Sequence, residues 1–149
     1  MTPEQKQLVQ HNWAMAAPHA DAVAQLFYQR LFKLDPAIES LFVGSDMVAQ
    51  RAKLIQALQL AVEGLGDLDS LIPMLEELGR RHQSYGVQDA HYDTVGAALL
   101  WTLERGLGHA WTDEAEAAWT EVFGVLAGAM RSVSRRPADE LAQGVHKVM

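Results

Sequence analysis

The sequence contains no cysteine among its 149 residues. It therefore has no disulfide framework, no thiolate metal site and no thiol nucleophile, and we expect a cytoplasmic protein. It also lacks a basic excess, because 12 lysines and arginines stand against 19 acidic residues, for a net charge of −7. An acidic chain without a basic stripe is not expected to bind nucleic acid or an anionic membrane.

Long apolar runs and the common catalytic motifs are missing as well. The longest apolar run, Val95 to Trp101, is far too short to span a membrane, and the polar start of the chain is unlike a secretory signal. No glycine-rich phosphate loop, H-E-x-x-H or G-x-S-x-G motif occurs, and no glutamate has a histidine three residues later, as di-iron bundles require. Histidine is therefore the main candidate ligand.

Apolar residues recur with a helical period along the whole chain. We find no alternating strand pattern, so the sequence predicts an all-α domain of about seven helices joined by short loops. The expected helices run from about 3 to 18, 18 to 34, 36 to 42, 47 to 63, 71 to 85, 89 to 107 and 112 to 136, with Pro73 in the first turn of the fifth. This pattern fits helix-packing folds better than an up-down four-helix bundle.

One histidine stands apart from the other five. Leu71, Leu75, Leu78 and His82 recur at three- and four-residue steps, which places His82 on the apolar face of a helix. Gly86 marks the end of that helix, and Tyr92 is an early inward-facing position of the next one. A histidine on an apolar face is more often a satisfied core residue than a ligand, so both interpretations remain open on spacing alone. The rest are expected near the surface: His11, His19, His91, His109 and His146.

Several short motifs, taken in order, carry a family resemblance. The chain resembles single-domain bacterial globins related to the haem domain of flavohaemoglobins, over about residues 4 to 133. A smaller set of these globins shares Leu78-Gly79-Arg80-Arg81-His82 with Tyr85-Gly86-Val87. The other motifs are Leu26-Phe27-Tyr28-Gln29-Arg30-Leu31-Phe32, Asp35-Pro36 with Leu41-Phe42, Gln50-Arg51 with Leu54, His91-Tyr92-Asp93-Thr94-Val95-Gly96, and Ala118-Trp119 with Phe123-Gly124-Val125-Leu126-Ala127.

The resemblance implies a globin fold around haem b. It makes His82 the proximal iron ligand with Tyr92 beside it, and Tyr28 and Gln50 the polar groups on the distal side. Other residues are expected to contact the haem, and Lys53 is the first choice to pair with its propionates, ahead of Arg51, Arg80 and Arg81. The expected haem contacts are Phe42, Leu54, Leu58, Leu78, Val95 and Leu99, of which Leu54 also borders the distal ligand.

The chain departs from the family pattern near its end. Flavohaemoglobin-like globins join the proximal histidine and tyrosine through a glutamate, whereas here no acid occurs between Glu121 and Asp139, and Ser134 stands about where the glutamate would be. Because a carboxylate would make the imidazole more electron-donating, its loss favours oxygen binding over oxygen activation. We expect a globin domain over 1–136 and a short tail over 137–149, with no reductase domain.

The expected function is reversible binding of oxygen, nitric oxide and carbon monoxide at a five-coordinate iron, with high oxygen affinity. Glutamine instead of histidine at Gln50 leaves no obvious sixth ligand on that helix. The alternatives are a nitric oxide dioxygenase served by a separate reductase, and a ligand sensor or sulfide scavenger. The same pocket would serve each of them, and a haem-free helical protein is the remaining alternative.

Overall fold

The computed structural model describes residues 1–133, and within them it is helical without a strand, as the sequence predicts. Short 3-10 turns connect several of the helices. The α-helices are α1 (Pro3–Ala16), α2 (Ala20–Leu34), α3 (Pro36–Glu39), α4 (Met47–Glu63), α5 (Leu68–Ser84), α6 (Asp89–Leu107) and α7 (Asp113–Ser132).

Most helix starts carry side-chain caps. Thr2 and Gln5 form a reciprocal capping box at α1, and the Asp35 side chain accepts a hydrogen bond from the Ala37 N–H at α3. Asp46 caps α4, and Thr112 caps α7. Each cap satisfies a backbone N–H that has no partner inside its helix.

The predicted start of α5 is wrong. We expected Pro73 in the first turn, whereas α5 begins at Leu68 and Asp67 caps it through the Ser70 N–H. Pro73 removes a backbone donor inside the helix. It is exposed, so water can satisfy the carbonyl that loses its partner.

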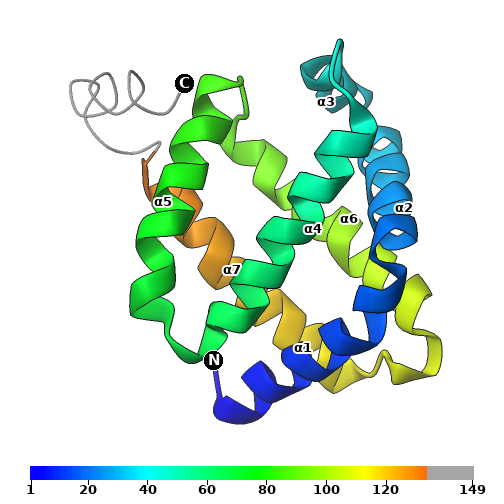
Figure 1. Cartoon of the computed structure of the whole chain (residues 1–149), viewed down its shortest axis with the longest axis vertical. Helices are drawn as coiled ribbons and strands as arrows, with labels where there is room; N and C mark the ends of the chain where they lie inside the picture. Colours follow the sequence, from blue (N-terminus) through cyan, green and yellow to red (C-terminus); the bar gives the residue numbers. More distant parts are fainter. Residues whose placement is uncertain (134–149) are drawn as a thin grey trace.

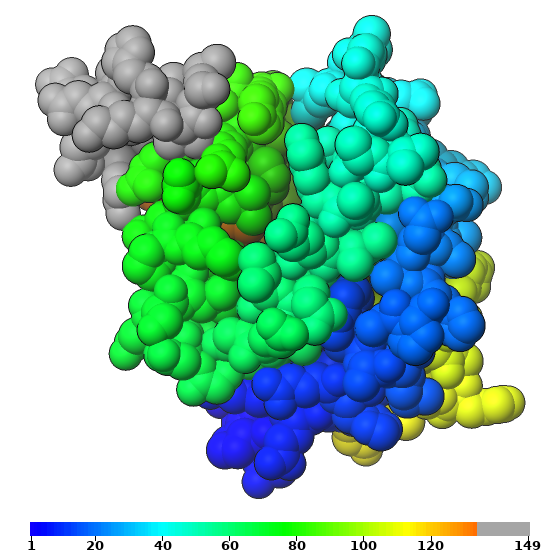
Figure 2. Space-filling view, viewed as in Figure 1, coloured from blue at the N-terminus to red at the C-terminus, as the bar shows by residue number. Residues whose placement is uncertain are grey.

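The core consists of two hydrophobic clusters. The larger cluster contains Trp13, Phe27 and Trp119, and the smaller one lies around Leu75 and Tyr92. The main helix contacts join α2 to α6, α5 to α7 and α1 to α7 (Figure 1). Because α4 packs mainly on α2 and α5 mainly on α7, the surface is hollowed between α4 and α5, and α7 is visible at the bottom of the hollow (Figure 2).

Some predictions fall outside the described residues. The helix end near Arg136, the domain boundary at 136/137, the tail and Ser134 all lie beyond residue 133, so they remain predictions. Among residues 1–133, no helix combines the length and the apolar character needed to cross a membrane.

Candidate functional site

The end of α5 fixes the position of His82. The Val87 N–H donates to the His82 carbonyl at 3.0 Å, and the Gly86 N–H donates to the Gln83 carbonyl at 3.1 Å. This is a Schellman motif, which requires a left-handed residue, and Gly86 has φ +94°. Val87 then packs against the smaller cluster. His82 is therefore held in the last turn of a helix whose end cannot easily unwind.

The surroundings of the His82 imidazole favour its neutral form, and within residues 1–133 the ring has no hydrogen-bond partner. Burial lowers its pKa, because an apolar surrounding disfavours the charged form. Within residues 1–133, no residue forms a hydrogen bond with either nitrogen of the ring. The Tyr92 ring does lie beside it, with the ring centroids 6.4 Å apart and the planes at 50°. A neutral imidazole with a free lone pair is the form that a metal binds.

Tyr28 is the centre of an aromatic group on the other cluster. Its ring centroid lies 5.1 Å from that of Phe27, 5.9 Å from Phe32 and 5.5 Å from Phe42. Burial raises the pKa of Tyr28, and a side-chain hydrogen bond with Gln50 lowers it. The side chains of Tyr28 and Gln50 are therefore close enough to interact.

The remaining lining residues divide between the two clusters. Phe42, Leu54, Leu58 and Val95 belong to the larger cluster and Leu78 to the smaller one; all of them are half-buried, whereas Leu99 is buried in the larger cluster. Leu54 and Leu58 on α4 and Leu78 on α5 flank the hollow, and their half-buried side chains leave apolar surface in water, at a cost of about 25 cal/mol per Å². A flat apolar group between α4 and α5 would cover that surface. The site therefore fits a haem.

The four cations considered for haem propionates differ in their partners. Arg51 forms an ion pair with Asp21 at 2.9 Å, and Arg81 forms one with Glu77 at 3.4 Å. Lys53 is exposed and Arg80 half-buried, and neither pairs with a carboxylate within residues 1–133. Lys53 and Arg80 are therefore the two cations that remain available to an incoming carboxylate.

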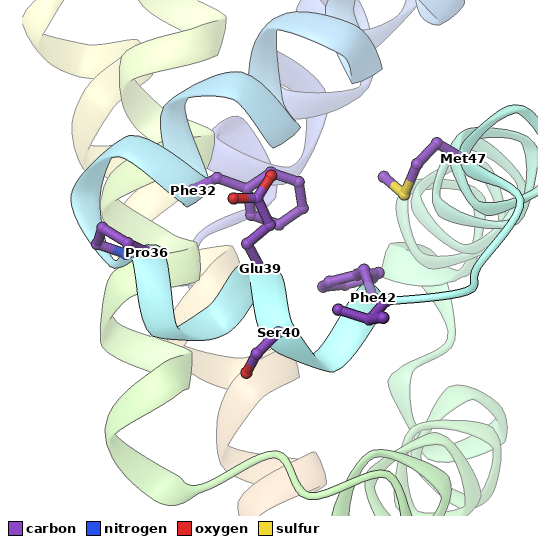
Figure 3. Close-up of a pocket in the computed structure, with 7 residues that line it drawn as sticks. Phe32, Pro36, Glu39, Ser40, Phe42 and Met47 are labelled. Carbon is purple, nitrogen blue, oxygen red and sulfur yellow. The ribbon is translucent and has the colours of Figure 1, made fainter.

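A hollow of about 470 Å³ opens beside Phe42, and Phe42 is the one predicted site residue that lines it. Figure 3 shows Met47, at the start of α4, pointing across toward Phe42, and the Glu39 carboxylate beside the Phe32 ring. This hollow adjoins the candidate site at Phe42. The sequence did not predict this hollow. Its lining residues are Phe32, Pro36, Glu39, Ser40, Phe42, Val43 and Met47.

Sequence reasoning also missed a cation on the proximal side. The guanidinium of Arg131, on α7, lies over the Tyr92 ring at 5.3 Å from its centroid. The Arg131 position lies 39 residues beyond Tyr92 in the chain, so no local spacing indicates the contact. In the sequence, the only sign of this contact was that Arg131 is a basic residue at the edge of the apolar face of α7.

The chain is similar in sequence to flavohemoproteins and neuroglobins. A flavohemoprotein from Bacillus subtilis (strain 168) is 30% identical over 131 residues, which cover 85% of this chain and 33% of that protein. Neuroglobin-2 from Oncorhynchus mykiss is 27% identical over 143 residues, covering 87% of this chain and 90% of that protein. The chain thus spans about a third of the length of the flavohemoproteins it matches.

The fold also matches a solved structure. The structure of a hexacoordinated heme protein from an anhydrobiotic tardigrade, at pH 4, superposes with a TM-score of 0.82 at 18% identity and covers 91% of this chain and 96% of that one. At this identity the match speaks for the globin fold alone. The family model for Globin matches residues 25–130. The chain therefore belongs to the globin family, and its relation to the haem domain of flavohaemoglobins is confirmed.

Proposed function

We propose that this globin carries haem b, with His82 as its one protein ligand, and reversibly binds oxygen, nitric oxide and carbon monoxide. The observation that supports this most directly is the neutral imidazole of His82, which has no hydrogen-bond partner in residues 1–133 and lies beside Tyr92. When bound, haem supplies an iron with an open position for a diatomic gas.

The chain's own side chains would then divide the work. His82 holds the iron from the last turn of α5, while apolar residues of both clusters exclude water from the porphyrin faces. Tyr28 donates its phenol hydrogen to the gas ligand, and Gln50 orients that phenol. Hydrogen bonds to a partly charged acceptor are worth about 1.5–3 kcal/mol each, so this pair supports high oxygen affinity.

The composition of α4 supports a five-coordinate iron. No histidine occurs between Met47 and Glu63, and the carboxamide of Gln50 is a weak iron ligand. Met47 lines the hollow beside Phe42, and Lys53 is exposed. Met47 and Lys53 are the two side chains of α4 whose donor atoms bind iron well, and neither is placed to act as a sixth iron ligand.

The decisive test is the absorption spectrum of the purified full chain. We expect an intense Soret band, lost in His82→Ala and retained in a control, His109→Ala, which removes an exposed histidine. A chain that takes up no haem under reconstitution would overturn the proposal. A five-coordinate ferrous spectrum is expected for the unliganded protein, and a six-coordinate one would contradict the role of Gln50.

The similarity to flavohemoproteins supports a second candidate, nitric oxide dioxygenase activity with a separate reductase as electron donor. The same Tyr28 and Gln50 side chains would serve it. Sustained consumption of nitric oxide with a cellular electron donor distinguishes this candidate, because a single reaction with nitric oxide is common to oxygenated globins. Without sustained turnover, oxygen binding or transport is the better assignment.

A further inference from the structure

Arg131 connects α7 to the start of α6. Its Nη2 donates to the Asp93 carboxylate at 2.7 Å and to the Asp89 backbone carbonyl at 3.3 Å, and its Nε faces the Asp89 carboxylate at 3.3 Å. On α6, Asp89 lies three residues before Tyr92 and Asp93 directly follows it. The guanidinium is thus held at several points directly over the Tyr92 ring.

The charged side chains of Arg131, Asp89 and Asp93 differ in their exposure to water. The Arg131 side chain is 22% exposed, whereas those of Asp89 and Asp93 are 60% and 80% exposed. Water screens exposed charges more strongly than buried ones. The arginine is the least exposed of the three groups, and at the Tyr92 hydroxyl its charge has a larger effect than that of Asp89.

Packing, and not hydrogen bonding, determines the position of Tyr92. Its side chain is buried, and within residues 1–133 its hydroxyl makes no hydrogen bond. The Arg131 guanidinium lies 5.3 Å from the centroid of the Tyr92 ring, and the centroid of the His82 ring lies 6.4 Å from it. The Tyr92 ring is therefore the group through which the Arg131 guanidinium can act on the His82 imidazole.

We propose that Arg131 is a positioning residue of the proximal side, which holds Tyr92 against His82 and brings a positive charge to the side of the site on which flavohaemoglobin-like globins carry a glutamate. The proposal rests on the proposed function, because its electronic effect requires haem at His82. A nearby cation stabilises the more electron-rich state of a redox centre. Arg131 should thus favour the ferrous state, in which a globin binds oxygen.

The test compares three variants of the haem-loaded full chain. Arg131→Met removes the charge and keeps most of the side-chain volume, and Arg131→Lys keeps the charge without the planar fork. Arg105→Met is the matched control, because Arg105 also stacks on an α6 aromatic ring, Trp101, at 4.0 Å, but away from His82. The measurement is a spectroelectrochemical titration of the ferric and ferrous forms.

We expect Arg131→Met to lower the ferrous-to-ferric ratio about threefold at fixed potential, which is about 30 mV at about 59 mV per tenfold for a one-electron couple. Arg131→Lys should retain most of that ratio, and Arg105→Met should leave it unchanged. An unchanged potential in Arg131→Met, or an equal drop in Arg131→Lys, overturns the electronic role.

A second measurement tests the positioning role and can be made without haem. A double-mutant cycle between Arg131→Met and Tyr92→Leu, measured by urea unfolding of the full chain with and without haem, should give a coupling of about threefold or more in the folding equilibrium constant. A coupling near onefold overturns the positioning role. A wild-type chain that lacks a Soret band but retains this coupling would instead refute the proposed function.

Discussion

Gly79 of α5 lies directly against the backbone carbonyl of Met130 on α7. A Cβ added at Gly79 would lie 2.7 Å from Val133 Cγ2 and 2.9 Å from the Met130 carbonyl carbon. Glycine therefore lets the two helix backbones approach. His82 is three residues beyond Gly79, and Arg131 directly follows Met130. The contact between Gly79 and Met130 therefore brings His82 and Arg131 to the same side of the site.

Gly79→Ala should push α5 away from α7. The nearest neighbours include backbone atoms, which cannot rotate aside, so we expect a loss of about 1–3 kcal/mol in the free energy of unfolding. Gly128→Ala, on α7 with no atom within 4 Å of the added Cβ, is the control and should stabilise by roughly 0.5–1 kcal/mol. Urea unfolding of both variants measures the difference. Equal effects would show that the close approach is unimportant.

The parts of the fold that were predicted from sequence are those that local patterns determine. The helix 89–107 was predicted with its observed bounds, since Gly106 and Gly108 end a clear apolar period. Gly86 was predicted as a helix end because glycine readily adopts the positive φ that ends many helices, and Gly86 has such a φ. Pro73 was misplaced, because a proline is compatible both with a first turn and with an exposed interior position.

The hydrogen bond between Tyr28 and Gln50 predicts how fast oxygen leaves. Tyr28→Phe removes the only hydroxyl of that pair and should speed oxygen dissociation about tenfold or more. Gln50→Leu should have a smaller effect, because it removes orientation but leaves the donor. Carbon monoxide carries little charge when bound, so its dissociation rate should change much less in both variants. Stopped-flow measurement of the two gases checks this, and an unchanged oxygen rate in Tyr28→Phe would refute the distal assignment.

The lowered pKa of His82 predicts how the haem-free chain responds to acid. Because burial disfavours its charged form, the unfolded chain binds a proton more readily than the folded one. Stability should therefore be complete above about pH 6.5, the ordinary histidine value, and decrease as pH falls below it. Urea unfolding at a series of pH values measures the slope.

His82→Gln should make that slope shallower, because glutamine cannot titrate. His109→Gln removes an exposed histidine and should leave the slope close to that of the wild type. If both variants flatten the curve equally, then the acid response is a property of histidine content and says nothing about the candidate site.

Contacts between distant helices could not be predicted. The tyrosine beside His82 was expected from the motif, but the cation over its outer side was not, because the Arg131–Tyr92 contact depends on how α7 crosses α6. The partner of each surface cation could not be predicted from the sequence either. Arg51 reaches Asp21 across the contact between α4 and α2, and no spacing rule relates residues 30 positions apart.

Lys53 and Arg80 give the last prediction, because they are the two candidate cations that form no ion pair within residues 1–133. If either pairs with a haem propionate, its replacement by Met should speed haem loss. An exposed ion pair is worth about 0.2–1 kcal/mol, which corresponds to a rate increase of at most about fivefold. Because Arg80 is half-buried and Lys53 is exposed, water screens a pair at Arg80 less, and Arg80→Met should have the larger effect. Lys33→Met, an exposed lysine on α2, is the control. Transfer of haem to an excess of apomyoglobin measures the three rates, and equal rates would mean that neither Lys53 nor Arg80 pairs with a propionate.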